Sequence, residues 1–121
     1  MLDEMLNMYL ITALWAETDN SNNDAGGDPL DKNYDVSDVA PEAMQKAKND
    51  CIVFIQKAGS LLDGLDMESV GHDFWLTRNG HGAGFWDGDY EKEIGIKLTE
   101  LSQQFGECHA YVGDDNKIYF E

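Results

Sequence analysis

One stretch of the chain concentrates the residue types that can do chemistry. Residues 72–87, HDFWLTRNGHGAGFWD, contain two of the three histidines, the only arginine, four aromatic residues and three glycines. Imidazole, guanidinium and carboxylate groups gathered this closely are typical of acid–base sites and of sites that bind anions. Whether they form such a site depends on how the chain places them relative to one another.

The pattern of this stretch predicts a β-hairpin. An Asn-Gly dipeptide at residues 79–80 lies between two alternating runs, which is the strongest short signal for a two-residue hairpin turn. Side chains alternate along a strand, so Arg78 would face His81 at the turn. His72 would face Asp87 at the open end. His72 and Arg78, the residue that faces His81, are six residues apart on one strand, which is about 20 Å. The two histidines therefore could not share a metal ion, and we expect no metal site.

The turn of this hairpin would form a small cationic tip on a very acidic protein. Arg78 beside His81 could receive a phosphate or a partner's carboxylate, because arginine presents two parallel donors. Trp75 would lie on the other face of the hairpin, opposite Gly84, where the glycines leave room for its ring. The alternative is that the protein's own acids neutralise the tip. The pair of His72 and Asp87 could be half of a catalytic dyad, or it could only close the hairpin.

Catalytic chemistry is sparse in the chain as a whole. The run GHGAG lacks the Lys-Ser/Thr of a P-loop and the spacing of a dinucleotide turn, so we expect no nucleotide cofactor. Cys51 falls on the apolar stripe of a predicted helix, where we expect a buried, inert thiol rather than a disulfide. Cys108 and His109 would point to opposite faces of a strand. These observations favour a binding protein without a cofactor over an enzyme.

Charge is the strongest global signal. Twenty-four acidic residues face eight lysines and arginines, which gives a formal net charge of −16. Residues 1–50 carry 3 − 11 = −8 and residues 51–121 carry 5 − 13 = −8, so no single acidic tail explains the charge. Such a field repels nucleic acid and anionic membranes and attracts basic protein surfaces. We therefore expect no direct binding to nucleic acid or membranes; the alternative to a partner is that the charge serves solubility alone.

The acidic residues form one close run. Asp87, Asp89, Glu91 and Glu93 alternate along the chain. Carboxylates arrayed in this way could imitate the phosphate charge of DNA on the basic groove of a partner. The candidate binding residues are therefore this run and the three residues near the hairpin turn: Trp75, Arg78, His81, Asp87, Asp89, Glu91 and Glu93.

Apolar spacing predicts three helices that would position these residues. Apolar residues recur at helical spacing over residues 2–16. A second helix is expected over residues 41–58, with proline in its first turn and Gly59 just past its end. A third follows the hairpin over about residues 90–105, with its apolar face formed by Ile94, Leu98, Leu101 and Phe105.

The remaining segments complete an α+β pattern. Residues 17–38 hold seven acids and one lysine, so we expect a mobile loop there. A short turn of helix is expected between Gly64 and Gly71, and a second hairpin around GDDNK near the end of the chain. The order predicts a single domain, residues 1–121, in which about three helices pack on a small antiparallel sheet of about four strands.

The chain resembles a family of small proteins encoded by tailed bacteriophages. The resemblance is carried by GHDFWLTRNGHGAGFWD, preceded by ITALW and VAPEAM and followed by LTELSQQFGECHAYVGDDNKIY. It covers nearly the whole chain apart from residues 17–38, and it transfers no catalytic residues. It implies expression in the cytoplasm of an infected bacterium, in an accessory role rather than in building the virion.

Charge and resemblance together predict a non-enzymatic protein that binds a host protein with a basic surface, such as a DNA-handling or defence component. Two alternatives remain open. The hairpin could instead grip a small anionic ligand, as a binding module or a minor enzyme. The chain could also be a minor structural component of the virion.

Overall fold

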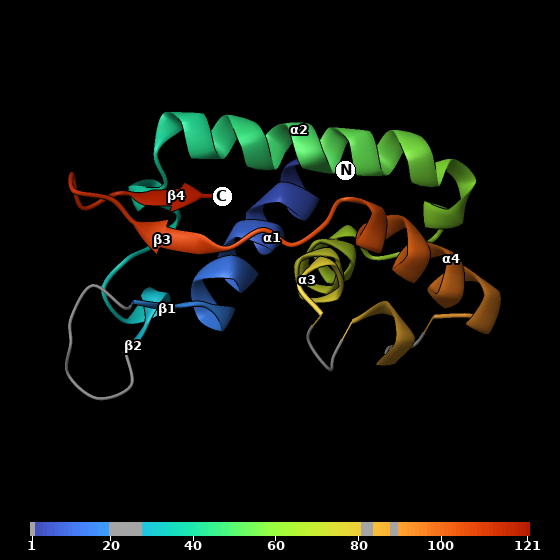
Figure 1. Cartoon of the computed structure of the whole chain (residues 1–121). Helices are drawn as coiled ribbons and strands as arrows, with labels where there is room; N and C mark the ends of the chain where they lie inside the picture. The colour runs from blue at the N-terminus through green and yellow to red at the C-terminus, as the bar shows by residue number, and fades with distance from the viewer. Residues whose placement is uncertain (1, 20–27, 81–83, 88–89) are drawn as a thin grey trace.

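The computed structural model describes residues 2–19, 28–80, 84–87 and 90–121. This part of the chain is α+β and mostly helical (Figure 1). The α-helices are α1 (Leu2–Ala16), α2 (Pro41–Ala58), α3 (Met67–Arg78) and α4 (Lys92–Gln104). The strands form two separate antiparallel pairs, β1 (Thr18–Asp19) with β2 (Asp28–Pro29) and β3 (Ala110–Val112) with β4 (Ile118–Phe120). The 3-10 helices are η1 (Leu30–Lys32), η2 (Val36–Asp38), η3 (Gly59–Leu62) and η4 (Phe85–Asp87).

The first two helices have the bounds that the sequence predicts. α1 covers residues 2–16, and α2 begins at Pro41, whose missing N–H would have no partner in the first turn. Gly59 ends α2 with a φ of 52°, a conformation that a residue without a Cβ adopts at low cost. In Figure 1, α2 runs along one side of the molecule, α1 crosses below it, and α3 is seen nearly end-on between α1 and α4.

The predicted hairpin over residues 72–87 is wrong. Its first half is the continuation of α3, which runs through the expected short helical turn and on to Arg78. Asn79 follows the last helical residue, and Gly80 has a φ of 71°. A glycine in this left-handed conformation is a common helix terminator, so the Asn-Gly dipeptide ends a helix instead of turning a hairpin. Residues 81–83, in the predicted return strand, lie outside the described residues.

This change alters the architecture within the predicted fold class. The described part of the chain has four α-helices where about three were expected, and its strands form two pairs instead of one four-stranded sheet. β1 and β2 lie within the expected loop at residues 17–38, and η1 and η2 follow them. Residues 20–27 of that loop lie outside the described residues, so its mobility stays a prediction.

The predictions of a helix after residue 90 and of a hairpin near the end of the chain are confirmed. Leu98 is buried on α4, and Ile94, Leu101 and Phe105 pack against the core. β3 and β4 form the expected hairpin, and Ala40 N–H donates to the carbonyl of Ile118 at 2.9 Å, which ties β4 to the start of α2.

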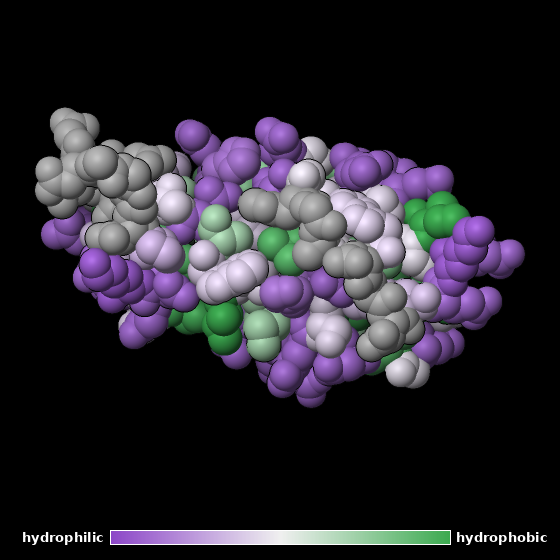
Figure 2. Space-filling model, turned by 90° about the horizontal axis from the view of Figure 1, so that it is seen from below, coloured by the Kyte–Doolittle hydropathy of each residue, from purple (hydrophilic) through white to green (hydrophobic). Residues whose placement is uncertain are grey.

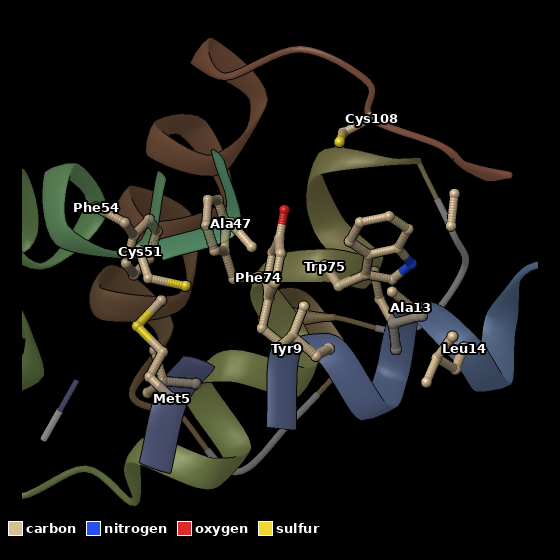
Figure 3. Packing of buried hydrophobic residues seen from close by; sticks show 14 of the residues in the cluster. Met5, Tyr9, Ala13, Leu14, Ala47, Cys51, Phe54, Phe74, Trp75 and Cys108 are labelled. Carbon is tan, nitrogen blue, oxygen red and sulfur yellow. The ribbon is translucent and has the colours of Figure 1, made fainter. Parts of the chain in front are cut away.

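Aromatic rings form the centre of the core (Figure 3). The ring of Phe74 on α3 stacks on Phe54 of α2 at a centroid distance of 4.4 Å. It also meets Tyr9 of α1 at 5.3 Å and Phe105 at 5.0 Å. Ring pairs at these separations add to the free energy gained from burial alone. One side chain of α3 therefore contacts α1, α2 and the end of α4.

A glycine allows α1 and α3 to approach closely. Gly71 lies in the middle of α3, and a Cβ built on it would be 2.2 Å from the carbonyl oxygen of Met5. No side chain fits in that gap, because the obstacle is backbone. The cost of glycine in a helix is offset here by the contact between the two helices.

Substituting this glycine tests the helix contact. Gly71→Ala in an unhindered helix would stabilise the protein by about 1 kcal/mol. Here we expect it to lower the free energy of unfolding by about 1–3 kcal/mol, because the new methyl group overpacks the contact with Met5. Urea denaturation followed by circular dichroism measures the change. Gln103→Ala, at an exposed site on α4, serves as a control and should lie within about 0.5 kcal/mol of wild type. Stabilisation by Gly71→Ala would contradict the packing described here.

Candidate functional site

The only arginine of the chain is buried, not displayed. The side chain of Arg78 is 3% exposed at the C-terminal end of α3. Its Nη1 donates to Asp50 Oδ2 at 2.8 Å and to the hydroxyl of Tyr9 at 2.9 Å. Its Nε donates to the carbonyl of Gly106 at 2.9 Å and its Nη2 to that of Phe105 at 3.2 Å. We call Arg78 and these four partners the Arg78 clamp.

The clamp joins all four α-helices. Tyr9 belongs to α1 and Asp50 to α2, and the two carbonyls follow the last residue of α4. Carbonyls at the end of a helix have no partner within it, and they carry the negative end of the helix dipole. A guanidinium satisfies both needs, since it supplies donors and positive charge together. The Cζ atom of Arg78 also lies 5.6 Å from the ring centroids of Phe74 and Phe105.

Arg78 keeps its charge inside the protein. Burial by itself would lower the pKa of Arg78, but the oxygen of Tyr9 and the carboxylate of Asp50 outweigh it, and the pKa is raised. Burial also raises the pKa of Tyr9 well above its ordinary value, so its hydroxyl stays neutral. The clamp is thus a buried cation held by the carboxylate of Asp50 and by three neutral oxygens, those of the Tyr9 hydroxyl and of the two carbonyls.

The predicted cationic tip is therefore wrong for its described members. Arg78 lies inside the clamp because α3 turns its side chain toward the core. Trp75 is fully buried against Tyr9 and Phe120. Its indole N–H has no hydrogen-bond partner in the described part of the chain. His81, the third member, lies outside the described residues. A ligand at the surface could not reach the Trp75 ring or the guanidinium.

His72 has a different neighbour from the one expected. Its Nδ1 lies 3.0 Å from the hydroxyl of Thr12 on α1, and its ring lies 6.0 Å from that of Trp15. The hydroxyl of Thr12 donates to the carbonyl of Met8, so its one proton is already used. His72 Nδ1 is then the donor in the second hydrogen bond. The histidine ties α3 to α1; the side chain of Asp87, its predicted partner, lies outside the described residues.

His109 makes surface ion pairs. Its Nδ1 lies 3.1 Å from Glu17 and its Nε2 lies 3.5 Å from Glu107. The hydrogen bond with Glu17 is the main cause that raises the pKa of His109. Its neighbour Cys108 is buried while His109 is exposed, as predicted from strand alternation. These contacts hold the start of β3 against the end of α1.

The cysteines do not form a nucleophilic site. Cys51 and Cys108 are both buried and free, as expected for Cys51. Burial raises the pKa of the Cys51 thiol to about 12, and it raises the pKa of Cys108 as well. A thiol with a raised pKa is mostly protonated at neutral pH and therefore a poor nucleophile. Among the described residues, no group of three or more His, Cys, Asp or Glu side chains is placed to hold a metal ion.

The acidic run is divided between η4 and α4. Glu91 lies at the N-cap of α4 and Glu93 in its first turn, and both are exposed. Acidic residues at a helix N-terminus also stabilise the helix, so these two have a structural use in addition to any binding role. Asp87 ends η4, but its side chain and the whole of Asp89 lie outside the described residues.

A groove lies beside this run, and the sequence predictions missed it. It encloses about 440 Å³ between η4 and α4. Phe85 is buried, whereas Trp86 and Ile96 are 48% and 49% exposed. The available signal was Ile96, which lies off the core-facing stripe of α4. The groove is lined by Phe85, Trp86, Tyr90, Glu91, Lys92, Gly95, Ile96, Thr99 and Glu100.

Gly95 determines the shape of the groove. A Cβ on this residue would lie 2.9 Å from the carbonyl oxygen of Phe85. Glycine therefore lets η4 lie close against α4, although it weakens the helix by about 1 kcal/mol relative to alanine. This contact explains why a glycine lies inside α4.

Comparison with protein-family models, curated proteins and solved structures gave no match for the chain. In the part of the chain that the structure describes, no helix is long and apolar enough to cross a membrane. The charge and shape of the surface are therefore the observations from which a function can be argued.

The clamp yields a direct test of its structural role. Arg78→Met leaves two end-of-helix carbonyls without their donor, and it leaves Asp50 with only the ion pair to Lys46 Nζ at 3.5 Å. Removing one partner of a buried ion pair costs about 3–5 kcal/mol. We expect the melting temperature to fall by roughly 10 °C or more. Arg78→Lys should also destabilise, because an ammonium cannot reproduce the planar fork. Lys48→Met on the exposed face of α2 is the control and should change little. A clamp variant that melts within about 2 °C of wild type would disprove the role.

Proposed function

We propose that this protein is a small acidic accessory protein that acts by binding a basic surface of another protein. The resemblance to phage proteins favours a partner from the bacterial host, such as a DNA-handling or defence component. The proposal concerns recognition rather than catalysis.

The carrying observation is where the positive charge lies. Arg78 is buried against Asp50, so the chain's only arginine is neutralised inside the fold. The remaining charges are 24 − 1 = 23 carboxylates and 8 − 1 = 7 lysines, which leaves the net charge of −16 to the rest of the molecule. Figure 2 shows one face on which hydrophilic residues predominate and hydrophobic residues form small, separate patches. Such a surface attracts basic partners and repels acidic ones.

The run at the start of α4 is the part of this surface best suited to imitate a phosphate backbone. Glu91 and Glu93 are exposed, next to a groove with a further carboxylate, Glu100, on its lining. Asp87 and Asp89 precede them in the chain and stay candidates from the sequence alone.

The two other functions have less support. Binding of a small anion by Trp75 and Arg78 is disfavoured, because both side chains are buried. Among residues 2–19, 28–80, 84–87 and 90–121, no specific contact or surface favours a virion component.

The proposal predicts that binding of a basic partner depends on the salt concentration and on which carboxylates of the protein are reversed. Immobilised protein should retain a basic host protein from bacterial lysate at about 50 mM salt and release it at about 300 mM, since attraction between exposed charges is screened. Binding of the purified partner should then weaken at least tenfold in the double variant Glu91→Lys with Glu93→Lys.

A matched control separates local recognition from overall charge. Asp3→Lys with Glu4→Lys also reverses two carboxylates at a helix N-terminus, and either double variant has a net charge of −16 + 4 = −12. The control variant, Asp3→Lys with Glu4→Lys, should weaken binding only two- to threefold. Failure to retain any basic protein at low salt would refute the proposed function, and equal losses in the two double variants would refute the role of the run.

A further inference from the structure

The groove between η4 and α4 combines an apolar base with exposed apolar walls. Phe85 is 1% exposed, and its ring is parallel to that of Phe54 at a centroid distance of 5.9 Å and meets that of Tyr90 edge-on at 5.3 Å. Its ring is thus fixed by the core, and the base of the groove is rigid. Preformed sites need less ordering when they bind, which favours affinity.

The walls carry apolar side chains that are about half exposed. Ile96 lies on α4 away from the core-facing side chains of Leu98 and Leu101, and half of it is exposed. Trp86 on η4 is exposed to the same extent. Tryptophan is among the residues that contribute most to binding when a partner covers them. Trp86 and Ile96 face one hollow, so a single partner could cover both.

The lining is acidic as well as apolar. Glu91 and Glu100 contribute to it, against one lysine, Lys92. Glu93 lies two residues from Glu91 and is exposed. An occupant must therefore offer apolar side chains to the base and positive charge to the rim.

These requirements decide between occupants. A second copy of this chain would bring another net charge of −16 to an already acidic groove, and nucleic acid would be repelled in the same way. A volume of about 440 Å³ holds a few side chains, not a whole domain. We propose that the groove docks a basic amphipathic segment of a partner protein, in which one or two large aliphatic side chains are flanked by lysines or arginines. This inference rests on the proposed function and assigns the recognition of the basic partner to the groove between η4 and α4.

A synthetic peptide can test the chemistry before the natural partner is identified. The probe is a fluorescently labelled helical peptide with leucines on one face and lysines on the other. Fluorescence anisotropy should show saturable binding with one peptide per protein. Replacing the leucines by serine, or the lysines by glutamate, should each weaken binding at least tenfold, because the groove requires both properties.

A matched pair of variants locates the site. Ile96→Ser should weaken binding of the leucine–lysine peptide at least tenfold. Ile11→Ser removes an isoleucine of similar exposure, 41%, from α1 and should change binding less than twofold. Circular dichroism of both variants verifies that each is folded.

Each other outcome is informative. Equal losses for Ile96→Ser and Ile11→Ser, or tight binding of the serine-substituted peptide, would overturn the groove while leaving a diffuse acidic interaction, and hence the proposed function, intact. Binding of the glutamate-substituted peptide would show an apolar site without charge selection and would overturn the proposed occupant. If the leucine–lysine peptide does not bind although the protein retains a basic partner in a salt-dependent way, the groove proposal alone fails.

Discussion

A single guanidinium inside the protein fixes the positions of the helices relative to one another. Arg78 extends from the end of α3 and reaches acceptors on α1, α2 and the end of α4. A charged group removed from water must recover its lost hydration through hydrogen bonds, so each acceptor has to stay in place. The buried arginine therefore constrains the relative positions of four helices more strictly than apolar contacts alone would.

The other features of the fold are consistent with this constraint. Phe74 lies one turn before Arg78 on α3 and, like Arg78, contacts α1, α2 and the end of α4. Gly71 lets α1 come close enough for Tyr9 to reach the guanidinium. By holding the end of α4, the clamp also fixes the helix that forms one wall of the groove. The structural centre and the proposed recognition surface are thus linked through α4.

Much of the fold is predictable from the sequence because the apolar spacing of α1, α2 and α4 is regular and their ends carry ordinary signals. The exception is α3. Phe74 and Trp75 are common in strands, Gly71 weakens a helix, and Asn-Gly is used both in hairpin turns and at helix ends. The choice between a hairpin and a helix here depends on the contact with α1, and a local sequence pattern does not show that contact.

The site was harder to predict than the fold. Arg78 and Trp75 are candidate binding residues by their type. Whether their side chains are buried depends on partners such as Tyr9 and Asp50, which lie far away in the chain. Glu91 and Glu93 are exposed, as their charge favours, and their role in binding stays a prediction. The groove beside them could not be foreseen, because it depends on how η4 packs against α4.

The clamp can be observed directly through the one arginine side chain. In a ¹⁵N-labelled sample, Arg78 gives the only arginine Nε–H signal. We expect a single sharp signal whose exchange with water at pH 7 is at least a hundredfold slower than that of free arginine, because the N–H is buried and donates to the carbonyl of Gly106. An Nε–H that exchanges as fast as free arginine would show an exposed guanidinium and contradict the central claim.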